Sequence, residues 1–285
     1  PEAEAGPDGQ PRMIPLQAHG IKLMSVGFLV DDSQPVIWRG PMVSQLLRQF
    51  LYQVDWAPLD YLIIDMPPGT GDVALTLAQS LQNVGLTGAV TVTTPQQVAA
   101  IDVIKSMEMF RKVNVPLLGI IENMAYFVAP DTGTRYDIFG SGAAAGLGER
   151  LDVPLLGQIP IGMSIRAGGD AGAPVTATAP DGEAARAFRE QRVFGAQLHA
   201  AREAVLRFAV LADAHVAGGD ATHCAVLGVE HLGRGEARID LDAQRFGLLA
   251  EPAANVAQAD DVVAVIVHQP RQGEVREAQR TALGQ

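Results

Sequence analysis

The stretch YLIIDMPPGTGD at 61–72 combines a carboxylate with a glycine-rich turn in a way that suits phosphate chemistry. A short apolar run, typical of a buried strand, ends at Asp65, and the turn after it opens a helix. In α/β folds, ligands bind beyond the carboxyl ends of the strands, where an aspartate can hold Mg²⁺. Gly69 and Gly71, on either side of Thr70, let backbone N–H groups approach a terminal phosphate. A plain strand–turn–helix junction with an aspartate cap is the alternative.

Alternating strands and helices are expected to position this turn. Apolar runs predict buried strands at 21–30, 61–64, 89–93, 115–121 and 155–159. Apolar residues at helical spacing predict helices at 41–54, 72–81, 96–112 and 140–151. Residues 123–139 break this rhythm and indicate a hairpin or an exposed loop. The alternation is typical of βαβ units, so we expect an α/β fold with a doubly wound, mostly parallel sheet covered on both faces.

The composition of the 285-residue chain excludes several classes of function. A formal net charge of −11 argues against a protein that binds the phosphate backbone of nucleic acids. No apolar run approaches the roughly 18 residues that a membrane span needs. The single cysteine, Cys224, excludes an internal disulfide and any metal site built from two thiolates of one chain.

Further motifs extend the one at 61–72 to much of the chain. They are GIKLMSVGFLV (20–30), PVIWRGPMV (35–43), LTGAVTVTTPQ (86–96), MFRKVNVPLLGIIENMAYF (109–127), YDIFGSG (136–142) and VPLLGQIPIGMSIR (153–166). With these motifs, residues 21–170 closely resemble the Mrp/ApbC group of P-loop ATPases, the iron–sulfur cluster carriers related to MinD. The resemblance implies a P-loop NTPase fold of the MinD-like type.

The resemblance also implies roles for individual residues. Asp65 matches the Walker B carboxylate that holds Mg²⁺, and Gly69, Thr70 and Gly71 match the turn at the γ-phosphate. Asn123 resembles the residue that reads the adenine edge, and Pro160 lies where the family packs a backbone turn against the base. Arg39, in WRGP, matches the segment near switch I. Without the resemblance, Asn123 fits a turn cap and Arg39 a solvated surface arginine equally well.

The family's activity gives the expected cofactors and partners. The resemblance implies a cytoplasmic protein that binds and hydrolyses MgATP at a homodimer interface, with the γ-phosphate ordering the switch loops. It implies iron–sulfur client or scaffold proteins as partners and a bound iron–sulfur cluster in the family. Neither nucleic acid nor a membrane is expected as a partner.

The sequence departs from the family pattern in two places. No GKGGVGK-like string occurs in the chain, and no lysine precedes Lys22. We therefore expect an N-terminally truncated form that lacks the first strand and the P-loop, binds ATP poorly, and leaves two central strands without their neighbour or paired differently. The cluster-binding CxxC would fall at positions 129 and 132, which hold Ala129 and Thr132, so cluster binding is not expected there.

The sequence divides into three parts. Residues 1–20 are a linker or a cut end, residues 21–211 form an incomplete Mrp-like nucleotide-binding domain, and residues 212–285 have no assignment. Disorder and a non-native tail are the alternatives for the third part, where the composition shifts abruptly. His215, His223, Cys224 and His231 lie there, but their spacing does not favour a zinc site.

Two other functions remain open from the sequence. A non-catalytic scaffold that retains the family's dimer surface would explain why both the Walker A string and the CxxC are missing. A MinD- or ParA-like positioning ATPase is disfavoured, because those relatives do not usually carry ENM-x-YF followed by YDIFGSG.

Overall fold

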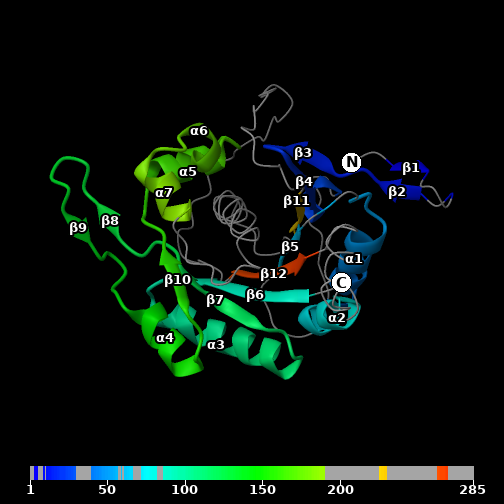
Figure 1. Ribbon diagram of the computed structural model, residues 1–285, viewed down its shortest axis with the longest axis horizontal. Coiled ribbons are helices and arrows are strands. Elements are labelled where there is room, and N and C mark those ends of the chain that lie inside the picture. The colour runs from blue at the N-terminus through cyan, green and yellow to red at the C-terminus, as the bar shows by residue number, and fades with distance from the viewer. Residues whose placement is uncertain are drawn as a thin grey trace, which may run out of the picture.

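An eight-stranded sheet forms the centre of the computed structural model, with strand order β10-β7-β6-β12-β5-β11-β4-β3 (Figure 1). The structure describes residues 3–5, 9, 11–29, 40–56, 59, 61–66, 72–81, 86–189, 225–229 and 262–268. The strands of the sheet are β3 (Leu16–Ala18), β4 (Ile21–Ser25), β5 (Tyr61–Asp65), β6 (Leu86–Thr93), β7 (Leu117–Glu122), β10 (Leu155–Gln158), β11 (Ala225–Val229) and β12 (Val262–His268).

The remaining described elements surround this sheet. The helices are α1 (Gly40–Tyr52), α2 (Asp72–Leu81), α3 (Gln97–Lys112), α4 (Ala143–Leu151), α5 (Met163–Asp170), α6 (Val175–Thr178) and α7 (Glu183–Arg189), with a 3-10 turn, η1 (Val26–Phe28). Two antiparallel ribbons lie outside the sheet: β1 (Ala3–Ala5) with β2 (Pro11–Met13), and β8 (Phe127–Val128) with β9 (Arg135–Tyr136).

Strand direction divides the sheet into two sets. β6, β7 and β10 pair in parallel, whereas β12 is antiparallel to β5 and β6, and β11 is antiparallel to β4 and β5. It follows that β4, β5, β6, β7 and β10 share one direction, and that β12, β11 and β3 run against them. The predicted α/β class, with strands of one direction joined by helices, is confirmed. Two of the three opposed strands, β11 and β12, come from the part of the sequence that received no assignment.

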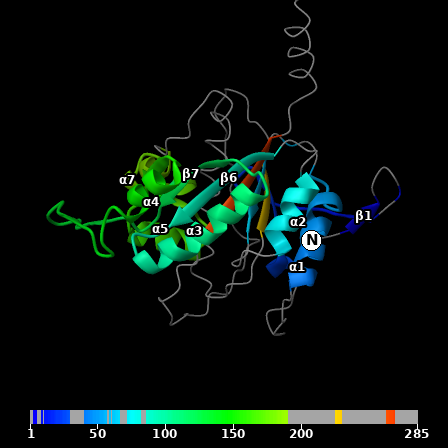
Figure 2. The same cartoon turned by 90° about the horizontal axis from the view of Figure 1, so that it is seen from below.

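Four helices cover one face of the sheet. Leu62 and Ile64 of β5 pack in one buried cluster with Leu47 and Phe50 of α1 and with Leu77 of α2. A second buried cluster joins α3 and α4 to β7. Figure 2 shows α1, α2 and α3 along this side of the strands. Because successive strand residues point to opposite faces, the odd-numbered residues of β5 face the other side.

Local pattern predicted most of these elements well, and one strand boundary wrongly. The predicted helices at 41–54 and 72–81 are α1 and α2, and the segment 123–139 contains the β8–β9 hairpin. The strand predicted at 21–30 ends at Ser25. There the Ser25 hydroxyl accepts a hydrogen bond from the backbone N–H of Gly27 (3.3 Å), and the chain turns into η1.

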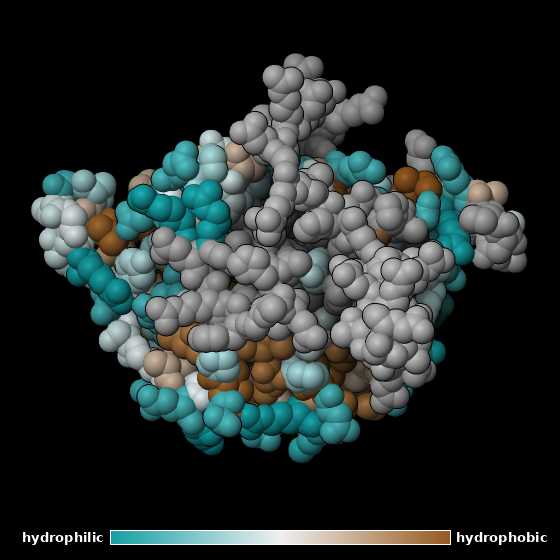
Figure 3. Space-filling model, viewed as in Figure 1, coloured by the Kyte–Doolittle hydropathy of each residue, from teal (hydrophilic) through white to brown (hydrophobic). Residues whose placement is uncertain are grey.

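The surface of the described residues carries both hydrophilic and apolar side chains. On the face shown in Figure 3, hydrophilic side chains line the lower margin and the hairpin at the left, and apolar side chains gather in a band between them and the grey atoms. Among the described helices, none combines the length and the apolar character that crossing a membrane would require.

Candidate functional site

Asp65 ends β5 as a nearly buried carboxyl group. Its side chain is 7% exposed and faces away from α1 and α2, since Ile64 packs against those helices. Burial raises the pKa of Asp65 from 3.8 to about 7, because desolvation disfavours the charged form. A cation placed beside this carboxyl would offset that effect and favour the carboxylate.

The surroundings of Asp65 fit one kind of metal better than others. No group of three or more His, Cys, Asp or Glu side chains suited to a metal occurs among the residues that the structure describes. A metal held by an all-protein cage therefore has no site in this part. Mg²⁺ is commonly bound by one or two carboxylates together with waters and substrate phosphates. A single carboxylate at a strand end fits that mode.

Asn123 lies directly after β7, at the same edge of the sheet as Asp65. Its backbone N–H donates to the carbonyl of Thr93 at the end of β6 (N···O 2.7 Å). Its side-chain Oδ1 accepts from the backbone N–H of Met124 at 2.9 Å, and Met124 has a φ of +51°. The Asn123 NH₂ group has no partner among the described residues. The Asn123 side chain thus caps a tight turn and still offers two N–H donors to a ligand.

The structure places Pro160 beside Asn123. Three backbone hydrogen bonds, with N···O distances of 2.8, 2.9 and 2.6 Å, join the segment 122–126 to the segment 159–161. Pro160 is buried in this junction, at the end of β10. Asn123 and Pro160, to which the family resemblance gives roles at the base, therefore lie in neighbouring segments of the chain.

Asp65 and the Asn123–Pro160 pair share an edge but are not in contact. β12 and β6 lie between β5 and β7, so three strand spacings, about 14 Å, separate the two places across the sheet. Asp65 is level with Val90 of β6, through Ala264, and so lies three residues before Thr93, to which Asn123 binds. The parallel strands direct both to their carboxyl ends, where ligands bind in α/β sheets. Gly69, Thr70, Gly71 and Arg39 lie outside the described residues, as do the tail residues His215, His223, Cys224 and His231.

Glu122 is a buried residue of this region whose role sequence reasoning missed. It is 1% exposed, and its carboxylate accepts hydrogen bonds from the backbone N–H of Ala144 (3.2 Å) and from Nε2 of Gln158 (2.5 Å). The first of these places negative charge at the start of α4, where the helix dipole favours it. Glu122 thereby holds β7, β10 and α4 together behind Asn123. The sequence feature that could have indicated this role is the glutamate of the ENM motif, which directly precedes Asn123.

Replacing Glu122 with alanine is expected to lower the free energy of unfolding by about 1–3 kcal/mol, because a buried N–H of Ala144 and the amide of Gln158 lose their acceptor. Urea denaturation followed by circular dichroism measures this. Glu149→Ala, at an exposed position of α4, is the matched control and should change stability little. Equal effects of the two substitutions would contradict the role given to Glu122.

The β8–β9 hairpin is exposed and offers no thiolate. In its turn, the backbone N–H of Ala129 donates to the carbonyl of Thr134 (2.9 Å), and that of Gly133 donates to the carbonyl of Ala129 (2.8 Å). The guanidinium of Arg135 lies 4.1 Å from the ring centroid of Tyr126 and pairs with Asp137 at 2.9 Å. Ala129 and Thr132 cannot ligate iron, so the side chains of this turn do not fit an iron–sulfur cluster.

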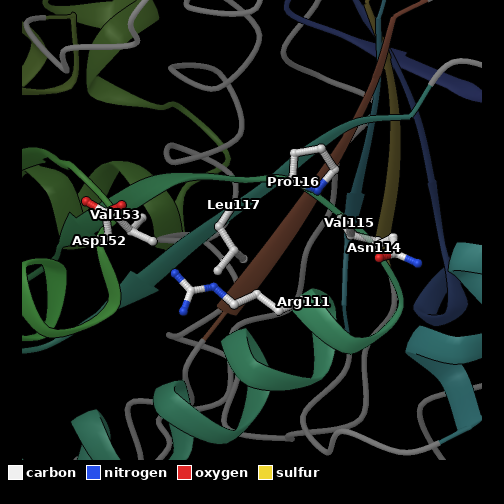
Figure 4. Close-up of a pocket in the computed structure, with 7 residues that line it drawn as sticks. All are labelled: Arg111, Asn114, Val115, Pro116, Leu117, Asp152 and Val153. Atoms are coloured by element: carbon white, nitrogen blue, oxygen red, sulfur yellow. The ribbon is translucent and has the colours of Figure 1, made fainter.

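An open hollow of about 350 Å³ lies at the opposite edge of the sheet, at the amino end of β7 (Figure 4). Pro116 and Leu117 form part of its wall, between the ends of α3 and α4. Arg111, which also lines it, donates a hydrogen bond to the carbonyl of Leu151. Because phosphate ligands bind at the carboxyl ends of such strands, this hollow is not the counterpart of the Asp65–Asn123 edge.

The class of the protein follows from this arrangement and from comparisons with known families. Strands of one direction, joined by helices and carrying a carboxylate and an amide at their carboxyl ends, define an α/β fold, in which ligands bind at that edge. The model of the NUBPL iron-transfer P-loop NTPase family matches residues 2–193, more than half of the chain. The chain therefore belongs to this family, the Mrp/NUBPL group of iron–sulfur cluster carrier P-loop NTPases, which confirms the resemblance seen in the sequence.

Individual proteins are similar to parts of the chain. An iron–sulfur cluster carrier protein of Synechocystis sp. is 50% identical over 188 residues, covering 66% of this chain and 52% of its own length. One of Deinococcus radiodurans is 52% identical over 178 residues, covering 62% and 49%. A solved nucleotide-binding protein from Archaeoglobus fulgidus, in complex with ADP, is 32% identical and covers 60% of this chain and 65% of that one, with a TM-score of 0.47. The chain spans about half the length of the curated relatives it matches.

Proposed function

We propose that this chain supplies the magnesium-binding and base-binding part of an iron–sulfur cluster carrier ATPase of the Mrp/NUBPL type. The supporting observation is the common edge that holds Asp65 at the end of β5 and the Asn123–Pro160 pair beyond β7. In this proposal Asp65 coordinates Mg²⁺, directly or through water, and Asn123 donates from its NH₂ group to the base. Pro160 packs against the base, and Arg39 with the turn at 69–71 responds to the γ-phosphate.

The proposal does not assign the binding of the β- and γ-phosphates to these 285 residues. A P-loop uses backbone N–H groups of a glycine-rich loop and a lysine on the β- and γ-phosphates. The 285 residues contain no GKGGVGK-like string. We therefore expect the chain by itself to lack the first strand and the P-loop of the fold, to bind MgATP weakly and to hydrolyse it slowly. In its complete form the protein would act as a cytoplasmic homodimer that serves iron–sulfur client or scaffold proteins.

Nucleotide titration tests this proposal. Titration calorimetry would compare the 285-residue chain with a version extended ahead of Pro1 by a segment carrying GKGGVGK. The extended version is expected to bind MgATP at least about a hundredfold more tightly, because charge-assisted hydrogen bonds of about 1.5–3 kcal/mol each are added.

Two controls sharpen this comparison. The same extension with its lysines changed to alanine should bind weakly. Within the extended version, Asp65→Ala should make ATP binding independent of Mg²⁺. Asn123→Ala should weaken the binding of ATP without affecting the binding of inorganic triphosphate. Tight MgATP binding by the unextended chain, or an extended version insensitive to Asp65→Ala, would contradict the proposal.

A non-catalytic scaffold is the second candidate, and the hairpin turn favours it. Ala129 and Thr132 stand where the family's cluster ligands are expected, so this turn carries no cluster. A scaffold would form a homodimer whose stability is indifferent to nucleotide. Analytical ultracentrifugation of the extended version with and without MgATP distinguishes the two, since only the ATPase should change its dimer dissociation constant.

A further inference from the structure

Two hydrogen-bonded side chains join β7 to β10 directly beside the Asn123–Pro160 pair. Glu122 is the last residue of β7, Gln158 is the last residue of β10, and the two lie opposite each other in the parallel ladder. The Gln158 amide donates to the Glu122 carboxylate, with an Nε2···Oε2 distance of 2.5 Å. Asn123 comes one residue after the first strand, and Pro160 comes two residues after the second. The hydrogen bond therefore lies where the two strands pass into the segments that carry Asn123 and Pro160.

The main chain alone gives β10 few constraints at this end. β10 is the last strand in the order of the sheet, so among the described strands it pairs with β7 only. Their ladder shifts register after Leu155, and two residue pairs follow the shift. Pro160 has no backbone N–H and adds no donor to the junction beyond the strands. A side-chain hydrogen bond at the end of this short ladder thus adds a constraint on the distance between Asn123 and Pro160.

The Glu122 carboxylate is also fixed by a third element. Its second oxygen accepts from the backbone N–H of Ala144 in the first turn of α4 (3.2 Å), a helix whose N-cap, Gly142, has no capping side chain. Glu122 is 1% exposed, so water competes little for either oxygen. Hydrogen bonds to an ionised acceptor are stronger than neutral ones. The carboxylate therefore holds Gln158 in place relative to both β7 and α4.

We propose that Glu122 and Gln158 form a positioning pair for the base of the nucleotide, acting through Asn123 and Pro160 rather than by contact with the base. The inference rests on the proposed function, which places the base at these two residues. Groups of a binding site need to be held within about 0.5 Å of their productive places. Without the pair, the end of β10 separates from β7, and the Asn123 amide and the Pro160 ring no longer fit the same base.

Adenosine is the probe that tests this pair, because it carries the base without a phosphate and does not need a P-loop. Its dissociation constant from the full 285-residue chain would be measured at pH 8 by NMR titration. The proteins are the parent, Glu122→Gln, Gln158→Glu and the double variant. Gln79→Glu, at an exposed position of α2, is the matched control for the change of charge. Asn123→Ala should remove the binding, which shows that adenosine occupies this site.

The pattern across the variants identifies the pair. Gln158→Glu should weaken adenosine binding about tenfold, because two carboxylates then face each other and separate the strand ends. Glu122→Gln should weaken it less, since Gln158 can turn its Oε1 toward the new amide. The double variant exchanges donor and acceptor and keeps an oxygen for the N–H of Ala144, so its affinity should return to that of the parent. Gln79→Glu should have no effect.

Hydrogen exchange gives a second readout, which needs no ligand. The backbone N–H groups of Ala125, Ile159 and Ile161 form the junction between the two segments. They should exchange faster in Gln158→Glu than in the parent, and the double variant should slow them again. A pair that only stabilised the fold would lower the urea midpoint without changing the adenosine affinity of the folded protein.

The outcomes separate this inference from the proposed function. Adenosine binding or junction exchange that is unchanged in Gln158→Glu would overturn the positioning pair and leave the base site intact. A double variant that binds no better than Gln158→Glu would do the same. A parent chain that does not bind adenosine, or binding that survives Asn123→Ala, would overturn the base site and the pair together. Since adenosine needs no P-loop, these results do not depend on the MgATP titration.

Discussion

Replacing Asp65 with asparagine is expected to stabilise the metal-free protein at pH 8 by up to about 4 kcal/mol, from a pKa shift of 3.8 to about 7 at 1.36 kcal/mol per unit. In the unfolded chain this carboxyl ionises near pH 3.8, whereas burial keeps it protonated in the folded protein until about pH 7. Between these values the folded state holds more protons than the unfolded state. Stability therefore falls as the pH rises through this window, and asparagine removes that fall.

Urea denaturation at pH 4 and pH 8 without Mg²⁺ measures this effect. The substitution should change stability little at pH 4 and most at pH 8. Asp55→Asn, at an exposed position, is the control and should change stability little. In the version extended by a P-loop segment, Asp65→Asn should weaken MgATP binding while it stabilises the fold. If the difference in stability between the variant and the parent is the same at pH 4 and at pH 8, Asp65 is not held protonated by burial.

A proline at Val265 is expected to lower the free energy of unfolding by about 1–3 kcal/mol, because proline cannot donate to the ladder and leaves a carbonyl in the middle of the sheet without its donor. Val265 pairs with Ile64 on one side and with Ala89 on the other, at the centre of β12. A break there affects the pairing of both β5 and β6. The loss should be visible as a lower urea midpoint.

Glu4→Pro is the matched control, since β1 pairs only with β2 outside the main sheet. It should leave the midpoint nearly unchanged. A Val265→Pro protein as stable as the parent would show that β12 adds nothing to the sheet.

Elements that depend on local pattern were predictable from the sequence. α2 was predicted at 72–81 and forms at Asp72–Leu81, because its apolar residues recur at helical spacing. β5 was predicted to end at Asp65, since a wholly apolar run there meets a charged residue and a double proline. The proximity of Asn123 and Pro160 was predictable only through the family resemblance, as it depends on the pairing of β7 with β10.

Features that depend on distant pairing were not predictable. The apolar runs of β11 and β12 are visible in the sequence, but no local signal states that they enter the sheet on either side of β5. The burial of Glu122 likewise depends on α4 and on Gln158, which follow it by more than twenty residues. The strand predicted beyond Ser25 failed for a local reason, because a hydroxyl hydrogen bond competes with strand extension at that residue.

The late position of β12 in the chain has a consequence during synthesis on the ribosome. β5 ends at residue 65, and β12 begins at residue 262, which is 197 residues later. At about 5–20 residues per second, translation needs roughly 10–40 s to cover that distance. Until β11 has been made, both sides of β5 lack the strands that pair with them in the structure, and the side that β12 covers lacks its strand for the whole interval. Its exposed amide and carbonyl groups can join neighbouring nascent chains. Yield in cells should therefore depend on how quickly ribosomes follow one another and on chaperones that shield nascent strands.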